Sequence, residues 1–338
     1  MRFFCISIYI VIMMLSIAVQ GQSLHYSQFF SSPLHLNPAL TGVIDSHWRF
    51  TNNIRTQGMY FGDPLNTTSV SYDQSVNLYK TKLGLGVLYS YDNAAGPSLP
   101  THKIYASGSS MVQVSERSYI GAGLQVGWVM RSLQYGNFSF PEQYDRETGG
   151  FNSLLPTSEN FLREFANYPD VNLGALWNYQ GEGYLLSTGL AMYHVNGAKD
   201  YFLNDNKPLR VRSNWHGSIK VKLNEQLYLL PQSYYTFHNK ASEFLIGSNV
   251  GMNLKSVNQD FRSISAGIYI RDGIKREFES MIFLLGLNYR NWTAISSFDV
   301  DISGLKTTNI FTNAFELTLI YQRPLALLKK TTIPCIRY

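Results

Sequence analysis

Apolar and polar residues alternate one by one along most of this chain. In one such segment Leu83, Leu85, Val87, Tyr89 and Tyr91 share one parity, and Lys82, Gly84, Gly86, Ser90 and Asp92 share the other. A period of two places alternate side chains on opposite faces of a β-strand, whereas a helical pattern repeats every three to four residues. The pattern therefore predicts a protein built from long β-strands.

Fourteen segments show this alternation, near residues 47–55, 66–73, 82–92, 103–114, 118–130, 170–179, 183–194, 210–223, 226–237, 242–254, 262–271, 279–289, 292–301 and 312–322. A soluble sandwich or propeller uses strands nearer to five or six residues. Tilted strands of about nine to eleven residues are typical of barrels that span an outer membrane. We therefore expect an all-β, transmembrane, antiparallel up-and-down β-barrel. Twelve or sixteen strands remain alternatives, because boundaries predicted from sequence shift by a few residues.

The two faces of the predicted strands differ in kind. Aromatic residues lie near the ends of the apolar faces, where membrane interfaces favour them: Tyr89, Tyr91, Trp128, Trp177, Tyr179, Tyr289 and Tyr321. Glycine recurs on the opposite face, at positions 84, 121, 123, 174, 247, 251 and 286. Small inward residues suit a narrow interior, so the pattern predicts a closed or plugged lumen.

The connections between the segments alternate in length. Those after even-numbered segments are mostly tight (115–118, 180–183, 224–225 and 290–291), and those after odd-numbered segments are mostly longer (56–65, 93–101, 131–169, 195–209 and 302–311). Bacterial barrels have short periplasmic turns and long outer loops. We therefore expect both termini in the periplasm. The short 238–241 and the longer 74–81 connections are exceptions.

The first residues have the layout of a signal peptide. Arg2 precedes an uncharged apolar stretch, and small residues follow near residue 21. The alternative is an N-terminal membrane anchor, but a polar segment follows instead of a stop-transfer flank. Cleavage would remove Cys5 and leave Cys335 without an internal partner. The longest later apolar run is Met281–Leu287, which excludes a bundle of spanning helices.

The amino-acid composition excludes several classes of protein. Charged residues make up 15% of the chain and aromatic residues 14%, and two cysteines are present. Whole-chain disorder and a disulfide scaffold are therefore excluded. A net charge of +5 without a dense basic run gives no sign of nucleic-acid binding.

The search for catalytic and cofactor motifs is negative. The glycines of Gly121–Gly127 lie inside an alternating strand, which is the wrong context for a dinucleotide site. The seven histidines show no metal-ligand spacing, and no nucleophile motif is present. His102 and His194 lie near the predicted rim without an evident partner in the sequence. We therefore expect no enzyme activity, cofactor or metal.

The beginning of the predicted mature chain carries a specific motif. Gln28, Phe29, Pro33, Asn37, Pro38, Ala39 and Gly42 fit a Q-[FY]-x₃-P-x₃-NPAxxG pattern. This pattern resembles the opening signature of the PorP/SprF family, a membrane component of the type IX secretion and gliding machinery of Bacteroidota. Arg49, Arg55 and Gln57, the 83–86 and 123–127 blocks, and a Pro-Arg-aromatic ending with Arg337 and Tyr338 are also similar to the family. At this ending Cys335 and Ile336 separate Pro334 from Arg337, one residue more than the family pattern has.

The resemblance implies an outer-membrane barrel without catalysis. Such barrels are associated with the export of particular cargo proteins and with holding them at the cell surface. These cargoes include gliding adhesins with a type B C-terminal domain. The resemblance also implies contacts with outer-membrane lipid and with periplasmic or lipoprotein components of the machinery.

The long 131–169 connection is a candidate cargo surface. It mixes aromatic and charged residues, among them Phe138, Phe140, Arg146, Phe151, Phe161, Arg163 and Phe165. The alternative is a plug or lid that packs on its own barrel.

The sequence divides into a signal peptide (1–21), a pre-barrel segment (22–45), the barrel (46–323) and a periplasmic tail (324–338). The pre-barrel segment has two prolines and no alternation, so we expect it to fold into the lumen as a partial plug or to bind a periplasmic partner. The tail is expected to contact a partner or to signal barrel assembly. The rival function is a pore or transporter for small solutes or hydrophobic compounds.

Overall fold

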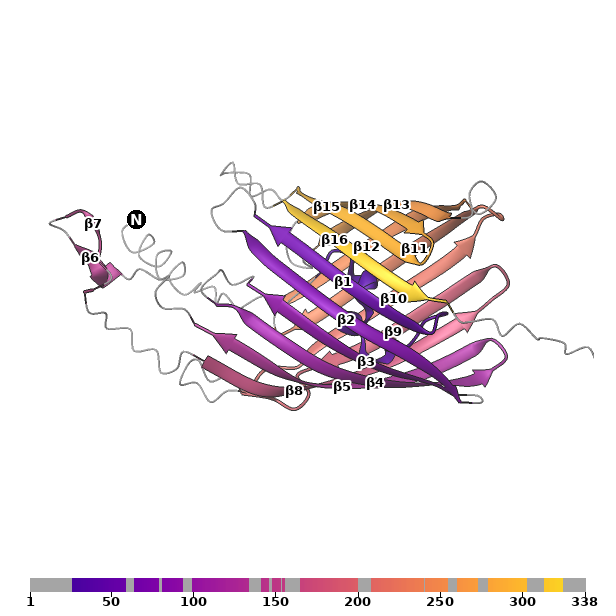
Figure 1. Ribbon diagram of the computed structural model, residues 1–338, viewed down its shortest axis with the longest axis horizontal. Coiled ribbons are helices and arrows are strands. Elements are labelled where there is room, and N and C mark those ends of the chain that lie inside the picture. Colours follow the sequence, from indigo (N-terminus) through magenta and orange to yellow (C-terminus); the bar gives the residue numbers. More distant parts are fainter. Residues whose placement is uncertain are drawn as a thin grey trace, which may run out of the picture.

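The computed structural model describes residues 26–58, 64–78, 81–93, 99–133, 141–145, 148–152, 154–155, 165–199, 208–239, 241–254, 260–272, 279–302 and 313–324. Within them, fourteen strands form one closed antiparallel barrel (Figure 1). The predicted signal peptide and most of the predicted tail lie outside the described residues.

The barrel strands are longer than those of a typical soluble sheet. They are β1 (Trp48–Gln57), β2 (Leu65–Leu78), β3 (Thr81–Asp92), β4 (Thr101–Ser115), β5 (Ser118–Ser132), β8 (Phe165–Gln180), β9 (Tyr184–Tyr193), β10 (Arg212–Lys222), β11 (Leu227–His238), β12 (Ala241–Asn253), β13 (Phe261–Asp272), β14 (Ser280–Tyr289), β15 (Trp292–Asp301) and β16 (Ala314–Arg323). A two-stranded sheet, β6 (Tyr144–Asp145) and β7 (Gly150–Phe151), follows the short helix η4 (Pro141–Gln143).

The barrel closes between its first and last strands. β1 pairs with β16 from Trp48↔Arg323 to Gln57↔Ala314 without a register shift. Every other barrel strand pairs with the barrel strands before and after it in the chain, and β5 pairs directly with β8. Closure pairs the first strand of the sheet with the last, and paired edges are the condition for a sheet to span the apolar part of a bilayer.

All fourteen predicted segments are strands, and two of them extend at one end by five residues beyond their predicted bounds. β2 continues to Leu78 because Gln74, which interrupts the apolar face, still pairs with Trp48 and Leu85. Two residues, and not eight, therefore separate β2 from β3. β8 begins at Phe165, and Pro169 pairs with Trp128. Residues 165–172 pair with β5 alone, and proline is tolerated at such an edge.

The alternation separates an apolar outer surface from a polar interior. Leu285 is 65% exposed and Val87 is 55% exposed, both on the outer face of their strands. Inward side chains of the same sheet are buried and polar, including Ser69, Ser71 and Asp73. No helix in the described part of the chain is long and apolar enough to cross a membrane.

The two ends of the barrel differ. We call the end with connections 58–64, 93–100, 133–164, 194–211, 239–240, 273–279 and 302–313 the loop end, and the end with connections 79–80, 116–117, 181–183, 223–226, 254–260 and 290–291 the turn end. At the turn end the Arg290 guanidinium, 2.9 Å from the Asp260 carboxylate, ties two connections together and lowers the pKa of Asp260.

An aromatic belt encircles part of the barrel at the turn end. The rings of Trp48 and Tyr321 lie 5.1 Å apart, and those of Trp292 and Tyr321 lie 4.9 Å apart. Tyr72 packs on Trp48, and Phe261 packs on Tyr289. These side chains project from adjacent strands on the outer face, where one membrane interface would lie.

Candidate functional site

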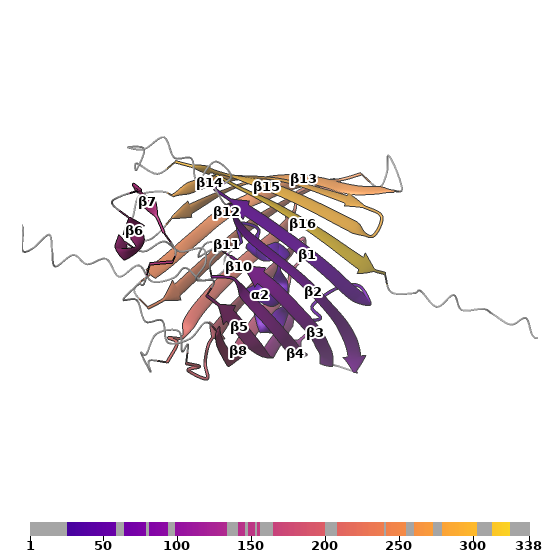
Figure 2. The same ribbon diagram turned by 60° about the vertical axis from the view of Figure 1, so that its left-hand side comes forward.

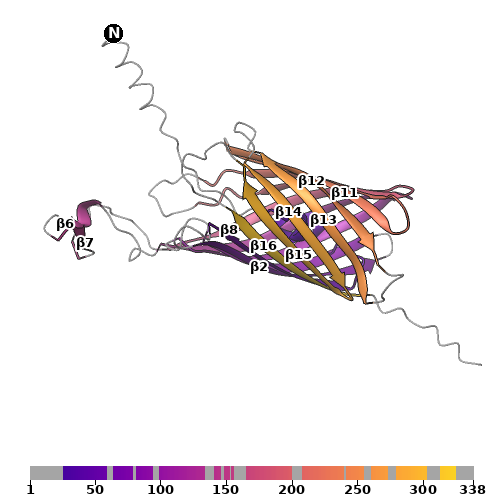
Figure 3. The same cartoon turned by 90° about the horizontal axis from the view of Figure 1, so that it is seen from above.

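Residues 26–44 lie inside the barrel, and residues 45–47, of which Asp45 and His47 are exposed, lead from them to β1; we call residues 26–47 the luminal segment. It contains three single turns of helix: η1 (Phe29–Ser31), α2 (Pro33–Leu36) and η2 (Pro38–Leu40). Figure 2 shows α2 within the ring of strands, and Figure 3 gives the view from above. Ser27 contacts strands near the loop end, whereas Gly42 contacts β2 near the turn end. The segment therefore runs along the lumen and then enters β1.

Asn37 fixes the middle of the luminal segment. Its Nδ2 donates to the carbonyl oxygens of Ala175 (3.0 Å) and Leu190 (3.1 Å) on β8 and β9. Its Oδ1 accepts from the backbone N–H of Ala39 at 2.9 Å, which caps η2. Pro38 occupies the first position of η2, where no N–H is needed. The Asn-Pro-Ala motif is therefore both a cap and an anchor to the barrel wall.

Glycines of the wall make room for the luminal segment. A Cβ added at Gly174 would lie closer than 3.0 Å to Oδ1 of Asn37, and one at Gly123 would meet the backbone of Pro38 and Ala39 equally closely. A Cβ at Gly84 would meet the backbone of Thr41. The inward glycines of the sequence thus permit close approach of a second backbone, which agrees with the predicted plugged lumen.

Gly42 forms a left-handed turn in the luminal segment, with φ +66°. Glycine adopts this conformation without the steric cost of a Cβ. The turn directs the Gly42 N–H at Oδ2 of Asp73, 2.8 Å away. The same carboxylate accepts two hydrogen bonds from Arg49, from Nε at 2.9 Å and from Nη2 at 2.7 Å. Asp73 therefore joins β1, β2 and the luminal segment.

The first motif residues anchor the segment at the loop end. Gln28 is fully buried, and its Nε2 donates to Oγ of Ser297 (3.0 Å) and to the carbonyl oxygen of Glu316 (3.0 Å). Phe29 stacks on Tyr234 with ring centroids 5.2 Å apart. Pro33 is buried at the start of α2. Together with the Asn-Pro-Ala motif and Gly42, these residues make the motif a set of contacts between the luminal segment and the wall.

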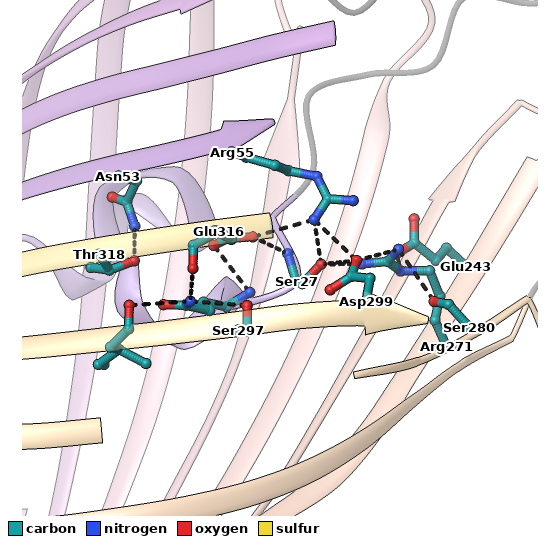
Figure 4. Close-up of polar contacts among 12 residues, drawn as sticks. Ser27, Asn53, Arg55, Glu243, Arg271, Ser280, Ser297, Asp299, Glu316 and Thr318 are labelled. Carbon is teal, nitrogen blue, oxygen red and sulfur yellow. Dashed lines mark hydrogen bonds and ion pairs between the residues drawn. The ribbon is translucent and has the colours of Figure 1, made fainter. Parts of the chain in front are cut away.

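Ser27 is the centre of a buried polar cluster at the loop end (Figure 4). Its hydroxyl donates to Oδ2 of Asp299 at 2.5 Å and accepts from Arg55 (2.5 Å) and Arg271 (2.6 Å). Its backbone N–H donates to Oε2 of Glu316 at 2.8 Å. One hydroxyl supplies one donor and two acceptor positions, so this side chain is fully used.

Ion pairs surround this hydroxyl. Arg55 lies 3.1 Å from Asp299 and 3.4 Å from Glu316, and Arg271 lies 3.3 Å from Asp299 and 3.1 Å from Glu243. The strands β1, β12, β13, β15 and β16 supply these groups. Burying a charge without a partner is costly, so the cluster favours the state in which the luminal segment is in place.

The other predicted site residues are not brought together with the motif. Phe151 is 60% exposed on β7 and Phe165 is 63% exposed at the start of β8. The remaining candidates lie outside the described residues: Phe138, Phe140, Arg146, Phe161, Arg163, Arg337 and Tyr338. Their roles in cargo or partner contact stay predictions.

Sequence reasoning missed most of the buried charges, although it noted Arg49 and Arg55 as family landmarks. Asp73, Arg271, Asp299 and Glu316 were not singled out. A signal was available, because each of these residues has the inward parity of its strand. In the described residues, no group of three or more His, Cys, Asp or Glu side chains is arranged to hold a metal ion.

These features define a class of protein: a membrane-spanning antiparallel barrel with a lumen occupied by its own N-terminal segment. A family model described as "Type IX secretion system membrane protein PorP/SprF" matches residues 18–321. The chain therefore belongs to the PorP/SprF family and is an outer-membrane β-barrel of type IX secretion.

Solved structures agree on the fold. The chain is similar to the CymD monoaromatic hydrocarbon channel, with TM-score 0.55 and 12% identity over 87% of this chain and 93% of that one. It is also similar to the TodX monoaromatic hydrocarbon channel deltaS2 mutant, with TM-score 0.51 and 11% identity over 87% of this chain and 94% of that one. At this identity the likeness shows the barrel fold alone. Comparison with curated proteins gives no match.

Proposed function

We propose that this barrel is a non-catalytic component of the type IX machinery that helps to export a specific cargo protein or holds it at the cell surface. The cargo class is adhesin-like, with a type B C-terminal domain. Membership of the family supports this proposal. The observation that carries it is the luminal segment, which buried hydrogen bonds hold to the wall from Ser27 to Gly42. A barrel filled in this way is suited to holding a protein at its rim.

The proposed orientation places the turn end in the periplasm and the loop end outside. Short turns and long loops are distributed in this way in bacterial barrels. Arg323 ends β16 at the turn end, so the tail 324–338 would begin in the periplasm. Tyr26 lies at the opposite end of the lumen, close to the loop end.

The cargo surface belongs, in this proposal, to the 133–164 connection. Its described part includes the β6–β7 hairpin, where the rings of Tyr144 and Phe151 pack with centroids 5.5 Å apart and both side chains remain exposed. Exposed aromatic residues with neighbouring charges are typical of protein-binding surfaces.

Affinity purification from solubilised outer membrane, with mass spectrometry of co-purifying chains, tests the cargo proposal. We expect a large surface protein to co-purify with the full chain and to be lost when residues 138–165 are deleted. Replacement of residues 303–311 by a glycine-serine linker is the matched control and should retain it. Undiminished cargo display after the first deletion would remove this loop from the proposal.

The tail is proposed to contact periplasmic or lipoprotein components of the machinery, or to guide barrel assembly. A chain that stops at Pro324 keeps every barrel strand. We expect it to lose partner capture or to assemble poorly. Normal barrel levels together with normal capture would contradict this role.

A pore for small solutes or hydrophobic compounds is the second candidate. The barrels that resemble this chain are named as monoaromatic hydrocarbon channels, which favours it. The occupied lumen argues against it. Conductance in planar bilayers decides between the two: a steady open-channel current from the full chain would support the pore.

A further inference from the structure

Towards the turn end, the luminal segment leans on one side of the barrel. Oγ1 of Thr41 lies 2.6 Å from Oγ of Ser107 on β4. Nζ of Lys82 on β3 donates to the carbonyl oxygen of Ile44. On the other side of the ring of strands, inward side chains of β9, β10 and β11 are exposed or half-buried at the turn end. We call these residues the open wall: Leu185, Lys220, Lys222, Tyr228 and Leu230.

Strand parity places the residues of β9 and β10 on the inner face. On β10, Lys220 and Lys222 share the parity of His216. The ring of His216 lies 3.2 Å from Nδ2 of Asn37, inside the barrel. Leu185 of β9 is the pairing partner of Lys220 and is 48% exposed. The exposure of Leu185 is therefore towards the lumen and not towards lipid.

Tyr228 and Leu230 of β11 face the same way. They share the parity of Tyr234, which is buried and stacks on Phe29 of the luminal segment. Tyr228 and Leu230 are half-buried and lie nearer the turn end of the strand. The inner face of β11 is therefore covered near the loop end and open near the turn end.

The two lysines of the open wall have their N–H donors available. Nζ of Lys220 lies over the ring of Tyr228, 4.5 Å from the centroid. The ring of Tyr228 in turn lies against Gly251, where an added Cβ would come closer than 3.0 Å to it. In the part of the chain that the structure describes, neither Lys220 nor Lys222 makes a hydrogen bond or an ion pair. Contact with an aromatic face positions an ammonium group and leaves its donors for an acceptor.

The charge around the open wall is positive. Asp45 is the one acidic residue in the sequence of the luminal segment, and it attracts both Lys220 and Lys82. Glu225 is exposed in the adjoining 223–226 turn. Three ammonium groups, those of Lys82, Lys220 and Lys222, thus face two carboxylates. The excess of positive charge favours an acidic partner.

The spacing of the two lysines matches an extended peptide. Residues that are two apart in a strand point to the same side, with their Cα atoms about 7 Å apart. Two acidic residues at positions i and i+2 of an extended segment have the same spacing, so both carboxylates can meet Lys220 and Lys222 together. Leu185 beside Lys220, and Leu230 beside Tyr228, offer apolar surface for neighbouring side chains of such a segment.

We propose that the open wall binds an extended acidic segment of a partner protein. Two carboxylates, two residues apart, pair with Lys220 and Lys222, and neighbouring apolar side chains pack on Leu185 and Leu230. The tail 324–338 is a poor occupant, because its sequence carries three basic and no acidic side chains. The periplasmic location of this partner rests on the proposed orientation of the barrel, whereas the binding itself does not.

Two matched peptides test the site on the full chain purified in detergent. The first is acetyl-Leu-Ser-Glu-Ser-Glu-Ser-Leu-amide, and the second has glutamine in place of both glutamates. We expect the acidic peptide to bind about tenfold or more tightly, because glutamine lacks the charge that the lysines require. Titration calorimetry gives both dissociation constants. These measurements do not involve the cargo, so they can fail while the cargo test succeeds, and the reverse.

Variants connect the binding to the open wall. The double variant Lys220→Gln/Lys222→Gln is expected to bind the acidic peptide about tenfold more weakly, and Lys220→Arg/Lys222→Arg to retain most of the affinity. Arg262→Gln is the matched control, since it removes an exposed charge near the same end, and should change the affinity less than about twofold.

Equal binding of the two peptides by the unmodified chain would overturn the proposal, and so would the absence of saturable binding at millimolar concentration. Both results are independent of the folding of any variant. Undiminished binding of the acidic peptide by a folded Lys220→Gln/Lys222→Gln variant would overturn the proposal as well.

Discussion

Arg55 faces the carboxylates of Asp299 and Glu316 in a part of the lumen where none of the three side chains is more than 5% exposed. Removing one partner of a buried ion pair leaves a charge without compensation, which costs about 3–5 kcal/mol. Arg55→Met should therefore lower the free energy of unfolding by about that amount. Urea unfolding in lipid vesicles measures it.

The control for this substitution is Arg262→Met. Arg262 is exposed near the turn end and makes one long hydrogen bond, 3.4 Å, to Asn291. Its replacement should change the free energy of unfolding by less than about 0.5 kcal/mol. Equal effects of the two substitutions would show that the buried cluster does not stabilise the barrel.

Substitution of Gly174 by alanine tests how tightly the luminal segment packs against the wall of the barrel. An alanine there would bring its Cβ closer than 3.0 Å to Oδ1 of Asn37, so the segment must shift or the wall must bend. Overpacking of this kind costs about 1–3 kcal/mol. Gly174→Ala should lower the melting temperature and speed proteolysis between residues 26 and 47. Gly108→Ala is the control, because the nearest atoms to its Cβ are 4.0 Å away.

At the scale of elements, the luminal segment can be linked covalently to the strand that it touches. Oγ1 of Thr41 and Oγ of Ser107 lie 2.6 Å apart, so cysteines at both positions are placed to form a disulfide. We expect Thr41→Cys/Ser107→Cys to oxidise during export, with peptide mapping as the measurement. The pair Thr41→Cys/Gln113→Cys, on the same strand, should stay reduced.

The strands could be predicted from the sequence because their information is local. Each strand carries its own alternation, so Leu83 to Tyr91 identify β3 without reference to its neighbours. The end of β2 could not be predicted in this way, because Gln74 is kept in the strand by pairing with Trp48 and Leu85.

The arrangement of the interior could be predicted from the sequence only in part. The luminal segment lacks a period, and its position depends on contacts such as that of Gln28 with Glu316, which are 288 residues apart in sequence. A single sequence indicates that glycines face inward, but it does not show which segment of the backbone packs against them. The sequence displays both the motif residues and the inward glycines, but only the structure shows that Asn37 contacts Gly174.

At the scale of the whole molecule, the outer surface is built to contact lipid. Leu285 lies midway along β14 and is 65% exposed. An arginine at the middle of the bilayer destabilises an outer-membrane barrel by about 2–4 kcal/mol. We expect Leu285→Arg to do so on refolding into vesicles. Leu154→Arg, at an exposed position outside the barrel strands, should stay within about 0.5 kcal/mol of the unmodified chain.

The polar cluster around Ser27 joins the start of the luminal segment to the last strand of the barrel. Glu316, which accepts from the N–H groups of Ser27 and Gln28, belongs to β16 and is therefore synthesised after the other thirteen barrel strands. Until that strand arrives, the opening residues have no acceptors at this position. Ser27 and Gln28 would thus bind in the lumen only after the final hairpin has been inserted. In an unfinished barrel these residues would remain accessible to proteases of the cell envelope.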